Sequence, residues 1–233
     1  MKKEEAKKLV SNALAQGRHV LLEPEAKALV SAWGIQVPNS VRIKEIEDVA
    51  VALKAVTPPL VLKVVSQDII HKRDVGGVIT GIDDREELSK ALREMKETLA
   101  EKAPAARIEG FLVEKMVPTG IELIIGGVRD PQFGPAVMFG TGGFAVELVK
   151  DVSFRLAPLS RAEVFEMMRE VKSYPLLTGF RGSKPVDLEK LASTVLKLSK
   201  ILLEIEAIKE IEINPLLVCD VGAVAVDARV VLQ

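Results

Sequence analysis

The chain has few of the residues that build disulfide frameworks or strongly charged surfaces. Among 233 residues there is one cysteine, and 32 lysines and arginines nearly balance 33 aspartates and glutamates, for a formal net charge of −1. A single cysteine excludes an internal disulfide framework and cannot form a zinc cluster alone, which indicates a reducing compartment. Cys219 stands in an apolar, strand-like run, so we expect a small buried residue. The balanced charge excludes a chain-wide field that would attract nucleic acid or an anionic membrane.

Long apolar runs are also missing. The first residues, MKKEEAKKLVSNALAQGR, alternate charged and apolar positions at helical spacing, which predicts a surface helix and excludes a signal peptide. The most apolar late segment, residues 216–232, contains Asp220, Asp227 and Arg229, which argues against a membrane span. With 48% apolar residues the chain can still bury a large core, and we expect a cytoplasmic globular protein.

Helical and strand patterns alternate through the first part of the chain. Pro24 suits the first turn of a helix that ends near Gly34, and a second helix is expected around residues 46–56. LVLKVV, residues 60–65, is short and β-branched, which predicts a buried strand. A loop and the strand VITGI follow, and Asp83-Asp84 is expected to cap an amphipathic helix that reaches residue 103.

The second part has strand-like pieces separated by short turns, which favours neighbouring antiparallel strands. Two helices, residues 160–171 and 187–205, flank a loop with the sequence GFRGSKP, and the end predicts a hairpin with its turn at residues 220–222. The pattern predicts an α+β fold in two parts, residues 1–107 and 108–233. We expect these parts to meet across a cleft near residues 105–110.

Three polar residues interrupt the apolar strands of the last hairpin. Alternation places Glu212 and Asn214 on one face of the first strand, and pairing can bring Asp227 beside them. Two carboxylates and an amide oxygen suit Mg²⁺ that takes its other ligands from water and phosphate. In the alternative interpretation, Asn214 shapes a strand end and Asp227 pairs with Arg229. The spacing alone does not choose between them.

Lys63 interrupts the strand LVLKVV, where a buried charge needs an anion such as phosphate, or else snorkels from a strand end. Gly76 and Gly77, which follow His71 in HKRDVGG, either let backbone amides approach a phosphate or form a turn.

Glu114 and Glu122, on either side of a proline-glycine turn, either hold ribose hydroxyls or are solvated. The backbone of residues 115–117 can offer adenine its donors and acceptors. The run FGTGGFAVE, residues 139–147, is either a close backbone approach to a ligand or a β-turn.

The ordered set LVLKVV, HKRDVGGV, FLVEKMV, GIELIIGG, FGTGGFAVE, FRLAPL, GFRGSKPVD, EINPL and VDARV resembles the beta subunits of ADP-forming acyl-CoA synthetases, of which acetate–CoA ligase (ADP-forming) is the type enzyme. The resemblance covers essentially the whole chain, and succinyl-CoA synthetase beta subunits look like more distant relatives. It implies an ATP-grasp fold, in which two α+β subdomains hold ATP in the cleft between them.

The resemblance also implies roles for individual residues. Nucleotide contacts would come from Lys63, Val65, Gly76, Gly77, Glu114, Lys115, Met116, Val117 and Glu122. Mg²⁺ ligands would be Asn214 and Asp227, and the catalytic residues would be His71, Lys63 and Glu212.

In this family a phosphoryl group passes through histidines, one on the partner subunit and one on a mobile loop of the ATP-grasp subunit. His71 matches the second, so we expect the segment 66–77 to move. His19 has no comparable setting and is expected to be structural.

The chain lacks a dinucleotide-type fold for CoA, which implies a CoA- and acyl-binding alpha subunit in an α2β2 heterotetramer. Two rival interpretations remain, a free-standing ATP-grasp carboxylate ligase and a nucleotide-binding regulatory module. Neither rival needs a phosphohistidine.

Overall fold

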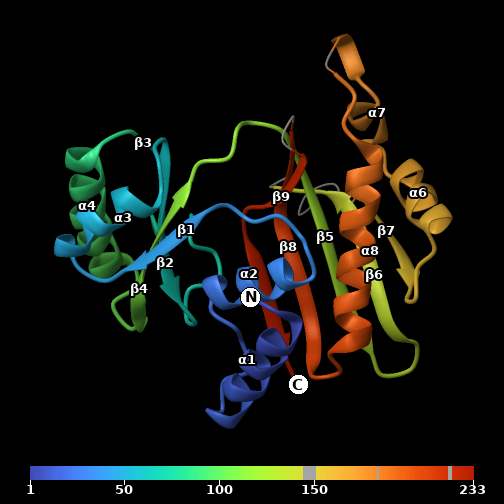
Figure 1. The fold of residues 1–233 in the computed structure, drawn as a ribbon, viewed down its shortest axis with the longest axis horizontal. Coiled ribbons are helices and arrows are strands. Elements are labelled where there is room, and N and C mark those ends of the chain that lie inside the picture. Colours follow the sequence, from blue (N-terminus) through green and yellow to red (C-terminus); the bar gives the residue numbers. More distant parts are fainter. Residues whose placement is uncertain (144–150, 183, 220–221) are drawn as a thin grey trace. The chain divides into compact units, whose positions relative to one another are not determined.

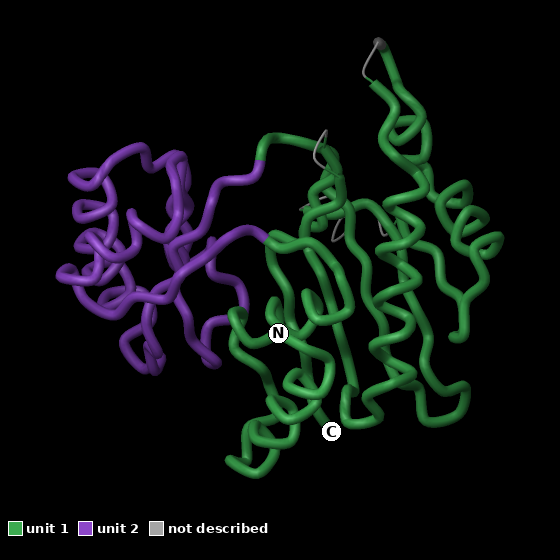
Figure 2. Tube along the Cα trace, in the orientation of Figure 1, with its two compact units in different colours: residues 1–37, 118–233 green, residues 38–117 purple. Residues whose placement is uncertain are grey.

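The chain divides into two compact units (Figure 2). The structure, a computed structural model, describes residues 1–143, 151–182, 184–219 and 222–233. Residues 38–117 form unit 2, and residues 1–37 together with 118–233 form unit 1. This division differs from the predicted boundary after residue 107. The reason is that β4 (Ile108–Lys115) is hydrogen-bonded between β1 (Ser40–Ile43) and β2 (Leu60–Ser66) and so completes the sheet of unit 2.

Unit 2 is an antiparallel four-stranded sheet in the order β1-β4-β2-β3, where β3 is Val78–Ile82. A short 3₁₀ turn, η1 (Ile46–Asp48), leads into α3 (Val49–Ala55), and α4 spans Arg85–Lys102. Alternation along β2 buries Leu62 and Val64 in one hydrophobic cluster with the apolar side chains of α3 and α4. Lys63 and Val65 therefore point to the opposite face of this sheet.

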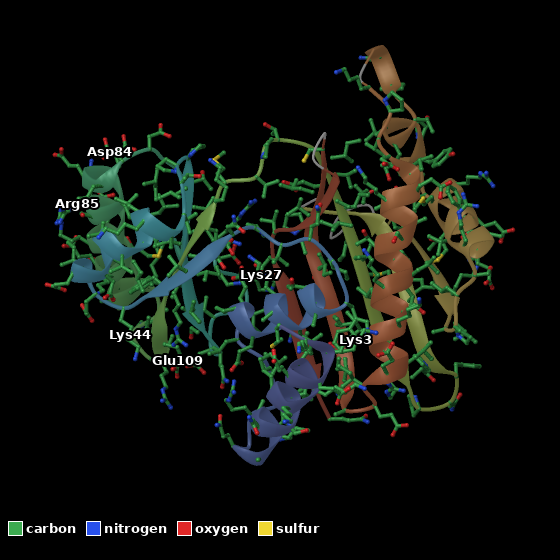
Figure 3. The ribbon with its side chains drawn as sticks, in the orientation of Figure 1. Lys3, Lys27, Lys44, Asp84, Arg85 and Glu109 are labelled. Carbon is green, nitrogen blue, oxygen red and sulfur yellow. The ribbon has the colours of Figure 1, made fainter. Side chains whose placement is uncertain are left out.

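Helix α4 begins where the sequence predicts it. The carboxylate of Asp84, labelled in Figure 3 at the start of the helix, accepts a hydrogen bond from the backbone N–H of Glu87 at 2.9 Å. Leu88, Leu92 and Met95 recur at helical spacing and are buried in the core of unit 2.

Unit 1 contains an antiparallel six-stranded sheet in the order β10-β8-β5-β6-β7, with β9 paired to the end of β8. Its strands are β5 (Ile121–Asp130), β6 (Gly134–Thr141), β7 (Val152–Leu156), β8 (Ile208–Cys219), β9 (Gly222–Ala225) and β10 (Ala228–Leu232). Its helices are α1 (Lys3–Ala15), α2 (Glu23–Ala32), α6 (Arg161–Glu170), α7 (Tyr174–Leu177) and α8 (Leu188–Glu204), with a 3₁₀ turn η2 (Phe180–Gly182). The expected antiparallel neighbours and the closing hairpin are confirmed, although the turn residues 220 and 221 lie outside the described residues.

The helices of unit 1 gather on one face of its sheet, where α2 and α8 lie in front of the strands in Figure 1. On this face Gly127 lies against Leu202 of α8, and inward side chains such as Phe139 and Ile211 are buried. The opposite face, which we call the open face, has no helix of the described chain packed on it in Figure 1. Phe154 of β7 is 52% exposed there.

Two further sequence expectations concern burial. Cys219, at the end of β8, is half-buried, whereas the sequence predicted a buried side chain. No helix in the described parts of the chain has the length and apolar character to cross a membrane.

Helix α2 buries an ion pair that the sequence did not predict. The charged groups of Glu23 and Lys27, one helical turn apart, lie 2.8 Å from each other.

Candidate functional site

Lys63 and Glu114 form a buried ion pair in unit 2. Their charged groups lie 2.8 Å apart, and the side chains are only 5% and 1% exposed. The register explains this contact, because Glu114 of β4 stands opposite Val61, two residues before Lys63 on β2, and the two side chains reach each other diagonally. Lys63 therefore does not extend its ammonium to solvent, and Glu114 is not solvated. The pair places a buried lysine ammonium, a group with three N–H donors of the kind that binds phosphate oxygens.

The backbone after β4 keeps one donor that suits adenine. The N–H groups of Lys115 and Met116 already donate to the carbonyls of Asn39 and Pro59, both at 2.9 Å. They are therefore unavailable to a ligand, which corrects part of the prediction. The N–H of Val117 makes no hydrogen bond with a described residue. Val65 is buried on the same face of β2 as Lys63 and can contribute only an apolar surface.

The segment that carries His71 is anchored at both ends. At its start, the Ser66 hydroxyl donates to the carbonyl of Arg107 at 2.8 Å, and the Asp68 carboxylate accepts from the N–H of Arg107 at 2.7 Å. At its end, the carbonyl of Gly77 accepts from the N–H of Val64 at 2.9 Å. The side chain of His71 is exposed between these anchors. The expected mobility of the segment stays a prediction.

Gly76 and Gly77 form a turn within this segment. Their N–H groups donate to the carbonyls of Arg73 at 3.1 Å and Lys72 at 2.6 Å, so both amides are engaged within the turn. Gly76 has a φ of +74°, and a Cβ on Gly77 would meet Val64. The turn interpretation therefore describes these two glycines, and their contact with phosphate stays a prediction.

Asn214 and Asp227 stand opposite each other in unit 1. Ala228 pairs with Ile213 and Arg229 with Glu212, so the same register continued by one residue sets Asp227 against Asn214. Side chains at opposed positions of an antiparallel pair share a face and have Cβ atoms about 5 Å apart. Both side chains therefore project from the open face. The hairpin places the two predicted metal ligands together.

Glu122 of β5 and the start of the glycine-rich run lie close to Asn214. The N–H of Gly143 donates to Oδ1 of Asn214 at 3.1 Å, and the N–H of Gly142 donates to the carbonyl of Glu122 at 2.9 Å. Gly143 has a φ of +64°, and a Cβ at this position would collide with the Glu122 carboxylate. Glycine allows both the positive φ and this close approach, whereas a Cβ would force the Glu122 carboxylate to move. The rest of the predicted run, residues 144–147, lies outside the described residues.

Asn214 and Asp227 suit Mg²⁺, which takes its remaining ligands from phosphate and water, better than they suit a metal ion held by protein side chains alone. Among the described residues there is no group of three or more histidine, cysteine, aspartate and glutamate side chains that could hold a metal ion. Mg²⁺ is commonly held by one or two carboxylates together with phosphate oxygens and water. Asp227 offers a carboxylate, and Oδ1 of Asn214 keeps one lone pair beside its bond to Gly143. The residues present therefore fit Mg²⁺ that is bound together with a nucleotide.

Glu212 lies on the same face, two residues before Asn214, and is half-buried. Its register partner on β10 is Arg229. The alternative in which Asp227 pairs with Arg229 is not observed, because the Arg229 side chain makes no ion pair or hydrogen bond with any residue that the structure describes. One oxygen of Asp227 instead accepts from the N–H of Ala228 at 2.9 Å.

Asp151 supports the site, and the sequence analysis missed it. Its carboxylate accepts from the hydroxyl of Thr141 at 2.8 Å and from the N–H groups of Lys172 at 2.7 Å and Ser173 at 3.0 Å. Burial by itself raises the pKa of Asp151, but these hydrogen bonds outweigh it and hold the pKa below its ordinary value. Asp151 thereby fixes the end of β6 next to Gly142 and Gly143.

Comparison with known proteins identifies the class of protein to which this chain belongs. An ATP-grasp domain model matches residues 12–232. The beta subunit of acetate–CoA ligase [ADP-forming] I from Pyrococcus furiosus is 44% identical over 227 residues, which are 97% of this chain and 97% of that protein. A succinate–CoA ligase [ADP-forming] subunit beta from Ignicoccus hospitalis is a more distant relative, 30% identical over 91% of this chain and 55% of that protein.

Solved structures that resemble this chain belong to the same class of enzyme. Acetyl-coenzyme A synthetase 1 of Ca. Korarchaeum cryptofilum, in complex with coenzyme A, Ca-AMPCP and HgCl⁺, is 46% identical and superposes with a TM-score of 0.95 over 98% of this chain and 100% of that one. A second structure of that enzyme, described with Mg-AMPPCP and a phosphohistidine segment pointing towards the nucleotide binding site, has a TM-score of 0.86 at 43% identity over 98% of this chain and 100% of that one. The chain belongs to the ATP-grasp family, within the group of beta subunits of ADP-forming acetate–CoA ligases. The predicted α+β ATP-grasp fold is confirmed.

Proposed function

We propose that this chain is the nucleotide-binding subunit of an ADP-forming acyl-CoA synthetase. The overall reaction is acyl-CoA plus ADP plus phosphate giving acid, CoA and ATP, and this chain performs the transfer between a phosphohistidine and ADP. The observation that carries the proposal is the opposed pair Asn214 and Asp227, joined through Gly143 to Glu122, in a chain that aligns over its whole length with beta subunits.

Each unit supplies its own residues. In unit 2, Lys63 contacts phosphate oxygens, while Glu114 and the N–H of Val117 serve the adenosine end. In unit 1, Glu122 serves the ribose, and Asn214 with Asp227 would hold Mg²⁺. When bound, Mg²⁺ neutralises phosphate charge as it develops during transfer. The Mg-AMPPCP in the Korarchaeum enzyme supports this assignment.

His71 carries the phosphoryl group in this proposal. A neutral imidazole nitrogen attacks the γ-phosphorus of ATP, so that an N–P bond forms while the P–O bond to ADP breaks, and the reverse reaction yields ATP. Lys63 stabilises the charge on the transferring oxygens. The exposure of His71 between two anchored ends supports a carrier role, because the ring is accessible to a donor and to an acceptor.

The acid and CoA chemistry belongs to a partner. The relative from Pyrococcus furiosus is named as a beta subunit, and the Korarchaeum enzyme was solved with coenzyme A. We propose a CoA- and acyl-binding alpha subunit and an α2β2 assembly. Mass measurement of the complex formed by the two co-expressed chains tests the stoichiometry.

The test of the metal site is Mg²⁺-dependent ADP binding to Asn214→Ala and Asp227→Asn variants. Each variant should weaken ADP binding at least tenfold in Mg²⁺ and change it little in EDTA. Metal dependence equal to that of the wild type would refute the assignment. Asp130→Asn, at the end of β5, is the matched control, because among the described residues its carboxylate accepts hydrogen bonds from the N–H groups of Gln132 and Phe133 alone.

A further inference from the structure

One hollow of unit 2 takes no part in the proposed function. It lies where the end of α4 and residues 103–107 meet the start of β4, and its volume is about 520 Å³. Figure 3 labels Lys44 and Glu109, which belong to its lining. Pockets that bind small organic molecules have volumes of about 300–1,000 Å³, so the hollow has room for such a ligand.

A β-bulge forms one wall of this hollow. Val65 pairs with Gly110 and Ser66 with Ile108, which leaves Glu109 as an extra residue on β4. Gly110 has a φ of +139°, and a Cβ at this position would lie 2.8 Å from a carbonyl oxygen of β1. The residues proposed to contact adenosine lie towards the other end of β4, about 20 Å away along the strand. The hollow is therefore separate from the nucleotide contacts of unit 2.

Small side chains leave the space, and buried apolar side chains form its floor. Ala100, Ala103 and Ala106 belong to the lining. Leu99 of α4 and Phe111 of β4 are each 3% exposed and belong to it as well. The hollow therefore offers an apolar surface to part of a ligand.

The charges of the lining leave one cation in excess. Three cations and two carboxylates line the hollow, where Lys96 is paired with Glu45 at 2.6 Å and Arg107 with Glu109 at 2.9 Å. The exposed ammonium of Lys44 makes no ion pair and no side-chain hydrogen bond with a residue that the structure describes. The net charge of the lining favours a monoanion over a dianion such as a phosphate ester.

The hollow is connected to the segment that carries His71. The side chain of Arg107 lines the hollow, while its backbone N–H donates to the Asp68 carboxylate at 2.7 Å and its carbonyl accepts from the Ser66 hydroxyl at 2.8 Å. Ile69 is buried in the same hydrophobic cluster that forms the floor of the hollow. A ligand in the hollow therefore touches residues that anchor the start of this segment.

We propose that this hollow binds a carboxylic acid with an apolar body and that the bound acid restrains the His71 segment. The inference adds regulation to the proposed function and rests on that function for its effect on His71. The carboxylate of the ligand meets the ammonium of Lys44, and its apolar body covers Leu99 and Phe111. A ligand that contacts residues 103–107 binds best when they are ordered, so it stabilises the hydrogen bonds of Arg107. Because an acid is a product of the proposed reaction, the site makes phosphoryl transfer sensitive to compounds of that class.

The experiment uses 4-phenylbutyrate as the probe and 4-phenylbutanamide as its neutral counterpart of similar shape. Calorimetry measures the binding of both compounds to the wild type and to three variants. Lys44→Gln removes the excess cation, and Ala100→Phe fills the hollow from an exposed position of α4. Lys90→Gln is the matched control, because Lys90 is an exposed lysine of α4 outside the lining. Thermal unfolding checks the fold of each variant.

The wild type should bind 4-phenylbutyrate with millimolar affinity and the amide about threefold more weakly. Lys44→Gln should bind the two compounds equally, Ala100→Phe should bind 4-phenylbutyrate about tenfold more weakly than the wild type, and Lys90→Gln should keep the wild-type affinity. No binding to the wild type, or wild-type affinity in Ala100→Phe, would overturn the inference. Equal affinity of the wild type for the acid and the amide would overturn the assignment of a carboxylate.

Hydrogen exchange and labelling test the restraint on the His71 segment. In the saturated wild type, the N–H groups of Arg107 and of residues 66–77 should exchange about threefold more slowly. Labelling of His71 by γ-labelled ATP and Mg²⁺ should also slow on saturation in the wild type but not in Ala100→Phe. Unchanged exchange or unchanged labelling in the saturated wild type would overturn the regulatory role. A wild type that binds the probe but is never labelled on His71 would instead overturn the proposed function.

Discussion

Replacement of Lys63 by methionine separates two roles of the buried pair in unit 2. The change removes a cation that is 5% exposed and leaves the Glu114 carboxylate, 1% exposed, without the ammonium at 2.8 Å. Removing one partner of a buried ion pair typically destabilises a protein by about 3–5 kcal/mol. For a chain of this size, such a loss lowers the melting temperature by roughly 6–20 °C.

A second substitution tests whether this loss comes from the buried charge. The double variant Lys63→Met/Glu114→Leu replaces both ions with apolar groups and should unfold within about 1 kcal/mol of the wild type. Lys96→Met is the control, because Lys96 pairs with Glu45 on the surface, where an ion pair contributes about 0–1 kcal/mol. Urea unfolding of the four proteins gives the loss of stability in each variant and the part of the Lys63→Met loss that the second substitution restores.

Nucleotide binding by the double variant then tests the phosphate contact. If Lys63 contacts phosphate and Glu114 the adenosine end, the restored fold should bind Mg·ADP at least tenfold more weakly than the wild type, measured by calorimetry. Wild-type affinity in a stable double variant would refute the phosphate role and leave Lys63 as a partner of Glu114 alone. A single variant as stable as Lys96→Met would refute the magnitude argued from burial.

Two further predictions concern unit 1. Gly143→Ala should weaken Mg²⁺-dependent ADP binding, because a Cβ would displace the Glu122 carboxylate, whereas Gly134→Ala, with a φ of +79° and open space around it, should alter stability alone. Equal ADP affinity in the two variants would contradict this reasoning. Because the pKa of Asp151 is lowered by folding, its stabilisation is present above about pH 4 and lost as the pH falls through the lower folded pKa. The melting temperatures of the wild type and Asp151→Asn should therefore differ most near neutral pH and converge in acid, and a constant difference from pH 2 to 7 would be inconsistent with that lowered pKa.

Local patterns in the sequence predicted the elements and one part of the site. The alternation in β8 and the short hairpin place Glu212, Asn214 and Asp227 on one face, because strand periodicity and a near neighbour in the chain determine that face. The N-cap of α4 is equally local. These features depend on residues close together in sequence, so they could be read before the fold was known.

Contacts between distant segments could not be predicted in the same way. The Lys63–Glu114 pair depends on the register of β2 and β4, which are separated by β3 and α4. The boundary after residue 107 was misplaced because a strand carries no local mark of the sheet that it joins. Gly76 and Gly77 indicated a special backbone, but only the hydrogen bonds to Lys72 and Arg73 show a turn.

The most direct test of the account is the covalent state of His71. The chain is incubated with γ-labelled ATP and Mg²⁺, alone and with the partner subunit, and phosphate that is labile in acid and stable in base is located by mass spectrometry. The account predicts label on His71 in the wild type and none at this site in His71→Asn, with the folds of both proteins intact. Absence of label on His71 under every condition would contradict the carrier role and favour a free-standing ligase or a regulatory module.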